Sequence, residues 1–165
     1  MQGSSASCAP GSLLLPNYFS VIADMTSATW NTQSKHEIAT VTGIVHMIVI
    51  PSITGTLTDA ADAAYIQLGT EVDTASLIAS TEAAGAGGGG ILSTGEIWVD
   101  ATPSDVVAQR TKIDALDFLV ANGADVGYEI TGAALTGGTI KFHVFWEQLP
   151  TDPTGAVVAG AGGVL

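Results

Sequence analysis

Three histidines and two glutamates are the residues whose types and spacing come closest to a metal site. His143 and Glu147 are four residues apart on one predicted strand, so their side chains share a face, and His36 and His46 share a face in the same way. Two such strands side by side can bring imidazoles and the carboxylate of Glu37 or Glu147 together, as zinc prefers. No tight pair such as His-x-His or His-x-x-x-His is present. Isolated strand histidines usually have hydroxyl or backbone partners, so we predict structural roles and no bound metal.

Four aspartates offer a second candidate, a calcium site. Asp59 and Asp62 are close in sequence, as are Asp114 and Asp117. A calcium loop needs a dense run of oxygen ligands such as Asp-x-Asp-x-Asp-Gly, and neither pair lies in one. We therefore predict that these carboxylates are solvated side chains of turns.

The sequence contains no motif for enzymatic catalysis. The glycine run at 85–90 invites comparison with a phosphate-binding loop, but no Lys-Ser/Thr follows it. There is no Gly-x-Ser-x-Gly and no His-Glu-x-x-His, and nothing around Cys8 would lower the pKa of its thiol. We expect a protein that is not an enzyme and binds no cofactor. Hydrolase chemistry from dispersed Ser, His and Asp is the alternative that remains open.

Three tryptophans suggest a binding surface of another kind. Trp30, Trp98 and Trp146 can stack on sugars if they lie together on a strand surface. Aromatic side chains on strands more often pack in a core or between subunits. The sequence favours packing and leaves glycan or receptor binding as an alternative.

The composition points to contact with other proteins. Apolar residues make up 47% of the 165-residue chain and charged residues 12%, about half the usual fraction. The mean hydropathy of +0.42 is high for a chain that must cover itself with polar surface. We therefore predict an obligate oligomer or permanent contact with a larger assembly.

The charge excludes several partners. Sixteen acidic residues against four basic ones give a net charge of −12, and Lys35, Arg110, Lys112 and Lys141 are scattered. Phosphate binding needs clustered cations, so we expect no nucleic acid and no membrane partner. The N-terminus lacks a positively charged signal region, and no apolar run approaches the ~20 residues of a membrane span. We predict synthesis in the cytoplasm as a soluble protein.

The strand that would carry His143 and Glu147 is the clearest element. Apolar side chains recur at every second position over 140–146, with polar residues and Phe145 between them. This alternation is typical of a strand with one buried face. We predict that it forms a hairpin with 128–131 across the Gly/Thr-rich connector 136–138.

The strand that would carry His36 and His46 is predicted over 36–50, with a kink or bulge at Gly43 and an end at Pro51. It is β-branched and apolar on both faces near its C-terminal end, which favours a central position. Other expected elements are strands at 18–23, 64–70, 95–100, 113–120 and 126–131, a strand or helical turn at 74–80, loops at 24–34 and 56–62, and a short helix at 105–111.

These elements predict an all-β fold, namely an antiparallel β-sandwich of about eight strands with a jelly-roll-like arrangement. The sandwich is expected over 17–150. The segments 1–16 and 151–165 are rich in small residues and proline, and we predict extended N-terminal and C-terminal arms there.

Five blocks carry a family resemblance: KHEIATVTG (35–43), GEIWVDATP (95–103), NGADV (122–126), GTIKF (138–142) and WEQLP (146–150). Together they resemble small β-rich virion structural proteins of tailed bacteriophages, over about residues 35–155. The resemblance implies a capsid decoration (cement) protein on the exterior of the virion, a homotrimer bound to the major capsid protein. It implies no site residues. A tail or fibre-associated component is the nearest alternative.

Overall fold

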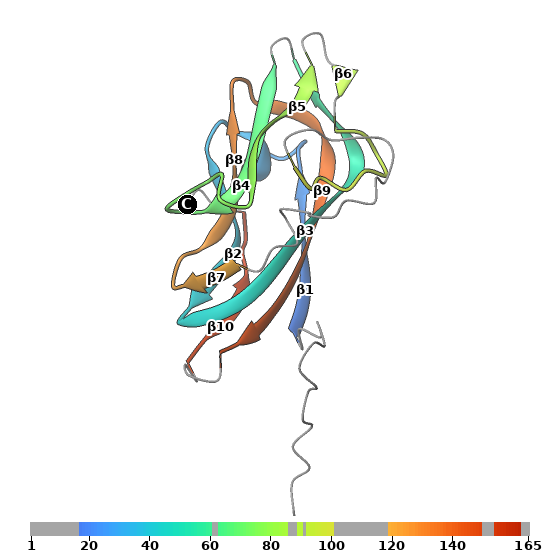
Figure 1. The fold of residues 1–165 in the computed structure, drawn as a ribbon. Coiled ribbons are helices and arrows are strands. Elements are labelled where there is room, and N and C mark those ends of the chain that lie inside the picture. The colour runs from blue at the N-terminus through green and yellow to red at the C-terminus, as the bar shows by residue number, and fades with distance from the viewer. Residues whose placement is uncertain are drawn as a thin grey trace, which may run out of the picture.

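The computed structural model describes residues 17–60, 63–85, 89–90, 92–100, 119–149 and 154–162. These residues form two antiparallel sheets and almost no helix, which confirms the all-β prediction (Figure 1). No helix in this part of the chain is long and apolar enough to cross a membrane. The elements are β1 (Asn17–Asp24), α1 (Ala28–Asn31), β2 (Lys35–Thr42), β3 (Ile44–Asp59), β4 (Ala64–Thr70), β5 (Ile78–Gly85), β6 (Gly89–Gly90), β7 (Leu119–Asn122), β8 (Val126–Thr131), β9 (Leu135–Gln148) and β10 (Ala156–Ala159).

The two sheets differ in size and in the strands they use. The four-stranded sheet has the order β1-β9-β3-β7, and the six-stranded sheet has the order β10-β2-β8-β4-β5-β6. The long strands β3 and β9 run side by side and form the centre of the smaller sheet (Figure 1). The described residues thus contain ten strands, against about eight expected from the sequence.

The apolar core lies between the sheets and contains side chains from both. Ile140, Phe142 and Val144 of β9 are fully buried, and Trp146 packs partly buried against the same cluster, which confirms the predicted alternation. The ring of Phe142 stacks on Tyr128 of β8 with 5.4 Å between ring centres. This contact joins the two layers at the middle of the core.

The predicted hairpin between 128–131 and 139–149 is wrong. β8 lies in the six-stranded sheet and β9 in the four-stranded one, so the chain crosses from one layer to the other between Thr131 and Leu135. Gly132 allows this crossing with φ +79°, where a Cβ would lie 2.4 Å from the carbonyl oxygen of Ala63. The connector 136–138 belongs to β9 itself.

The predicted single strand over 36–50 is two strands in different sheets. β2 ends at Thr42, β3 begins at Ile44, and Gly43 between them has φ +64°. The expected kink at Gly43 is therefore a crossing between layers, because a left-handed residue ends the pleat.

Pro51 does not end the strand as expected, since β3 continues to Asp59. The amide of Ile53 donates to the carbonyl of Glu96 (2.8 Å), and the amide of Trp98 donates to the carbonyl of Pro51 (3.1 Å). Odd-numbered residues of β3 therefore direct their backbone groups away from β9 here. The N–H that Pro51 lacks would point to that side, so the β3–β9 ladder loses nothing.

Several smaller expectations also change. The predicted loop 56–62 is strand β3 as far as Asp59, and the predicted strand 95–100 makes one isolated bridge, between Ser52 and Ile97. The predicted loop 24–34 contains α1, and 74–80 is a turn followed by the start of β5. The expected helix at 105–111 and most of the strand at 113–120 lie outside the described residues.

The predicted C-terminal arm is in part a strand. Within 151–165, β10 pairs with β2 at the edge of the six-stranded sheet, and Val157 is buried there. Gly155 and Gly160 flank β10 at backbone contacts that a Cβ would obstruct, at 2.6 Å from the Ile44 carbonyl and 2.8 Å from the Glu37 carbonyl. Close packing therefore holds a segment whose composition suggests an arm. The predicted arm 1–16 lies outside the described residues.

Candidate functional site

The outer face of the four-stranded sheet gathers polar and apolar side chains that the core does not use. It is formed by the side chains of β1, β3 and β9 that alternate with the buried ones. On β1 these are the exposed Tyr18, Ser20 and Ile22. On β3 and β9, the side chains of this outer face include His46, Ser52, His143, Phe145 and Glu147.

His143 is the centre of a hydrogen-bond chain on this face. The hydroxyl of Tyr18 lies 2.9 Å from its Nδ1, and the Oγ of Ser52 lies 3.1 Å from its Nε2. Ser52 donates its own proton to the backbone carbonyl of Lys141 (3.2 Å). The consistent set of donors is therefore Tyr18 O–H to Nδ1, Nε2–H to Ser52, and Ser52 O–H to the carbonyl.

This direction of donation argues against a serine nucleophile. A serine–histidine pair in catalysis needs an unprotonated imidazole nitrogen that accepts the serine proton. Here the His143 Nε2 donates, and the Ser52 proton already has a carbonyl acceptor. The arrangement orders Tyr18 on the surface and does not activate Ser52.

The pKa of His143 agrees with this set of hydrogen bonds. Desolvation by burial, and then the positive charge of Lys141, lowers the pKa of the His143 imidazole below its ordinary value. The neutral ring is therefore favoured at neutral pH, as the Tyr18 O–H donor requires.

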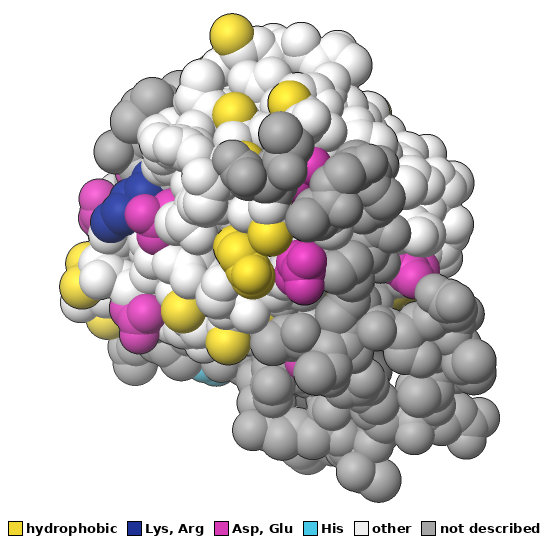
Figure 2. Space-filling model, turned by 90° about the horizontal axis from the view of Figure 1, so that it is seen from above, with side chains coloured by type: hydrophobic (Ala, Val, Ile, Leu, Met, Phe, Trp, Pro, Cys, Tyr) yellow, Lys and Arg dark blue, Asp and Glu magenta, His cyan; other side chains and the backbone are white. Residues whose placement is uncertain are grey.

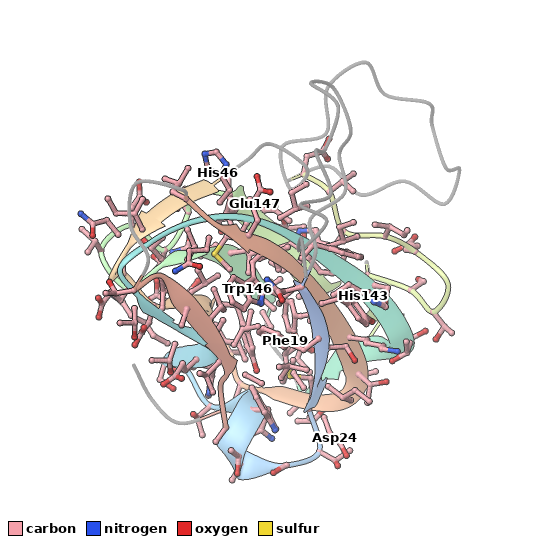
Figure 3. All side chains as sticks on the ribbon, turned by 90° about the horizontal axis from the view of Figure 1, so that it is seen from below. Phe19, Asp24, His46, His143, Trp146 and Glu147 are labelled. Carbon is pink, nitrogen blue, oxygen red and sulfur yellow. The ribbon has the colours of Figure 1, made fainter. Side chains whose placement is uncertain are left out.

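The other two histidines lie in different surroundings. His46 Nδ1 is 3.3 Å from Glu147 Oε1 across the β3–β9 pair, and both side chains are partly exposed (Figure 3). His36 is fully buried: its Nδ1 is 2.9 Å from the carbonyl of Thr29, and its Nε2 is 2.8 Å from the carbonyl of Thr32. His36 therefore holds the segment around α1 against β2.

The structure does not bring the candidate metal ligands together. His36 belongs to the six-stranded sheet, whereas His46 and His143 are on the four-stranded sheet, where His46 lies opposite Glu147 and His143 opposite Ile50. Figure 3 shows His143 apart from the His46–Glu147 pair. Within the described ranges, no group of three or more His, Cys, Asp or Glu side chains is arranged to hold a metal.

Of the four candidate aspartates, the structure describes only Asp59. Asp59 is buried, and its Oδ2 accepts the backbone N–H of Ala64 at 3.1 Å, so it closes the turn between β3 and β4. Asp62, Asp114 and Asp117 lie outside the described residues. The predicted solvated position is wrong for Asp59, whose side chain is buried where its Oδ2 bonds to the backbone of Ala64.

The tryptophans do not form one platform. Trp98 is fully buried and donates its indole N–H to Thr81 Oγ1 at 2.9 Å. Trp30 stacks on Tyr128, with ring centres 6.4 Å apart, and Trp146 packs on the core. The interpretation as packing residues is therefore confirmed for these side chains.

The two remaining sequence candidates carry no site. The described residues of the run 85–90 lie in β5 and β6, which pair with each other, so they belong to a sheet and not to a helix. Cys8 lies outside the described residues.

The β1 residues of the outer face were not among the candidates from the sequence. Tyr18 and Ile22 are 52% and 58% exposed, although both are large and apolar. The signal was available, since Tyr18, Ser20 and Ile22 alternate with Phe19 and Val21 on a predicted strand. Alternation alone does not tell which of two apolar sets faces the core.

The described surface otherwise reflects the charge imbalance. Figure 2 shows acidic side chains at several separate places on the face seen from above, and basic side chains in one place. Lys35, one of the few cations, donates to the backbone carbonyl of Glu71 at 3.0 Å.

The chain matches no protein-family model, no curated protein and no solved structure.

Proposed function

We propose that this chain is a non-enzymatic virion structural protein of a tailed bacteriophage. Its most specific form is a capsid decoration (cement) protein that associates with itself and binds the major capsid protein on the exterior of the head. The observation that carries this proposal is a fold of two packed sheets in which Tyr18 and Ile22 are exposed on the outer face of the four-stranded sheet. Such a surface favours protein partners over a small-molecule substrate.

The charge distribution supports a protein partner as well. With 4 basic residues against 16 acidic ones, the surface offers little to nucleic acid or anionic lipid. Burial of apolar area at contacts stabilises an assembly by about 25 cal/mol per Å². Summed over many copies on a shell, that gain can oppose the internal pressure of packaged DNA.

A jelly-roll-like arrangement is part of this proposal. The crossings between layers at Gly43 and between β8 and β9 support it, because such folds pass repeatedly from one sheet to the other. A tail or fibre-associated component is the second candidate, since the same exposed outer face would serve an assembly there.

Co-sedimentation with purified heads of the phage that encodes the chain tests the function. We expect the protein to pellet with heads that lack it, to reach saturation, and to raise the temperature at which they break. Binding to tails and not to heads would favour the second candidate. A protein that stays in the supernatant with both would contradict the proposal.

A further inference from the structure

Among the described residues, one edge of β1 has no partner strand and presents unpaired backbone groups. Among the described strands β1 pairs only with β9, and the amide of Met25, just after β1, donates to the carbonyl of Gly138 at 3.0 Å. In this ladder the odd-numbered residues therefore face β9. The backbone N–H and C=O groups of Tyr18, Ser20 and Ile22 point to the other side, where a further strand can pair with them.

This edge differs from the other sheet edges that the structure describes. β7 and β10 have four residues each and β6 has two, whereas β1 has eight. Short edge strands, lysine, proline and bulges are the usual protection against strand addition. β1 contains no Lys, Pro or Gly, its register with β9 is continuous, and its one charged residue is Asp24 at its end.

The residues with free backbone groups also carry the exposed side chains. Tyr18 and Ile22 project from the outer face, and Ser20 between them is exposed. The Tyr18 ring is held by His143 and lies 4.9 Å from the ring of Phe145. The edge thus offers an ordered strand with side chains already fixed, which lowers the entropic cost of pairing.

We propose that this edge pairs with β1 of a second copy of the chain, antiparallel about a two-fold axis at Ser20. In this register Ser20 lies opposite Ser20 of the other copy, and Tyr18 lies opposite Ile22. Every free backbone group of the three residues is then bonded, and each Tyr18–Ile22 pair joins an aromatic to a β-branched side chain. The two four-stranded sheets become one continuous sheet.

Hydrogen bonding favours this register over the one with its two-fold axis at Val21. The carbonyl of Asp24 already accepts the amide of Ser27 at 3.0 Å, so Asp24 does not extend the free edge. A two-fold axis at Val21 would place Tyr18 opposite Asp24 and leave part of the Tyr18 backbone unpaired. The axis at Ser20 instead bonds all the outward backbone groups of Tyr18, Ser20 and Ile22 without using Asp24.

This contact rests on the self-association proposed above and makes it specific. A two-fold contact involves two copies only, so it predicts a homodimer, in place of the homotrimer that the family resemblance implies. The contact buries no ion pair and needs no other molecule.

Charge exchange at Ser20 tests the register. We expect Ser20→Lys and Ser20→Glu each to raise the dissociation constant of the dimer at least about tenfold, because like charges then face each other. An equal mixture of the two variants should recover a mass of twice 16.6 kDa in sedimentation equilibrium. Ser80→Lys, the same change at an exposed position of β5, is the matched control and should associate like the unaltered chain.

The outcomes separate this inference from the proposed function. A dimer that Ser20→Lys leaves intact, a mixture that does not recover, or an unaltered trimer would overturn the β1 contact while self-association stands. An unaltered chain that stays monomeric would overturn both. A dimer that behaves as expected but binds no phage particle would support the contact and contradict the decoration function.

Discussion

At the scale of single residues, two histidines act in opposite surroundings. His36 is fully buried with both ring nitrogens facing backbone carbonyls, whereas His143 lies on the outer face between two hydroxyls. The first fixes a loop to the six-stranded sheet, and the second orders an exposed tyrosine. Neither arrangement presents a free imidazole to a substrate.

His36→Leu should lower the free energy of unfolding by about 1–3 kcal/mol, because it removes the buried imidazole whose N–H donates to the carbonyl of Thr29 or of Thr32. Urea denaturation followed by tryptophan fluorescence measures the change. His46→Leu is the control, since His46 is partly exposed, and we expect a change below about 1 kcal/mol. Equal losses in the two variants would contradict the role given to His36.

The pKa of His143 predicts a pH dependence. Burial and the Lys141 charge lower this pKa from 6.5, so the unfolded chain binds the proton more readily than the folded one. The folded state should therefore lose stability as the pH falls through 6.5 and below, to the lowered pKa. We expect His143→Gln to reduce this loss, measured as thermal unfolding between about pH 7 and pH 5. Identical pH profiles for the two proteins would contradict the assignment.

At the scale of elements, glycines set where strands bend and cross. Gly138 has φ +98°, and a Cβ there would lie 2.5 Å from the carbonyl oxygen of Thr56, in the irregular part of the β3–β9 pair. Gly123 has φ +68° and open space around its Cβ position. A side chain at position 138 is disfavoured by both the backbone conformation and the lack of space, whereas at position 123 only the backbone conformation disfavours it.

Gly138→Ala should therefore cost more stability than Gly123→Ala. We expect about 1–2 kcal/mol for Gly123→Ala, from the left-handed backbone alone. Gly138→Ala should cost about 3 kcal/mol or more, because the backbone of β3 must also move. Chemical denaturation of both variants measures the difference. A smaller cost at Gly138 would show that β3 and β9 do not approach as closely as described.

The sequence predicted the strands better than their partners. Alternation over 140–146 identified the buried face of β9, because side-chain burial follows a local period. The assignment of β8 and β9 to different sheets depends on contacts far apart in the chain, and a Gly/Thr-rich connector resembles a hairpin turn in either case. The expectation that Pro51 ends the strand was wrong for a related reason. The effect of a proline depends on whether its missing N–H would point toward the neighbouring strand, and at Pro51 it would point away from β9.

The candidate site was harder to predict than the fold. The residues singled out for chemistry by type, such as His36 and Trp98, proved to be internal. His46, His143 and Glu147 lie on the outer face but form no metal site, and the β1 residues beside them, Tyr18, Ser20 and Ile22, have types that suggest no chemistry. Their importance comes from an open strand edge, which appears only when the order of strands in the sheet is known.

At the scale of the whole molecule, composition and architecture agree. A chain with 47% apolar and 12% charged residues fills one core between two sheets and still exposes large apolar side chains. Two of these side chains, Tyr18 and Ile22, lie on β1, the longest edge strand that the structure describes. We therefore predict that the molecule covers this edge by pairing with another copy of itself.

Hydrogen exchange of β1 at two protein concentrations tests this claim most directly. At high concentration we expect the amides of Ser20 and Ile22 to be protected, and on dilution below the dissociation constant to exchange rapidly. The amides of Phe19 and Val21, which face β9, should stay protected at both concentrations and serve as the internal control. Exchange at Ser20 and Ile22 that is rapid at every concentration would contradict the pairing of β1 with a second copy.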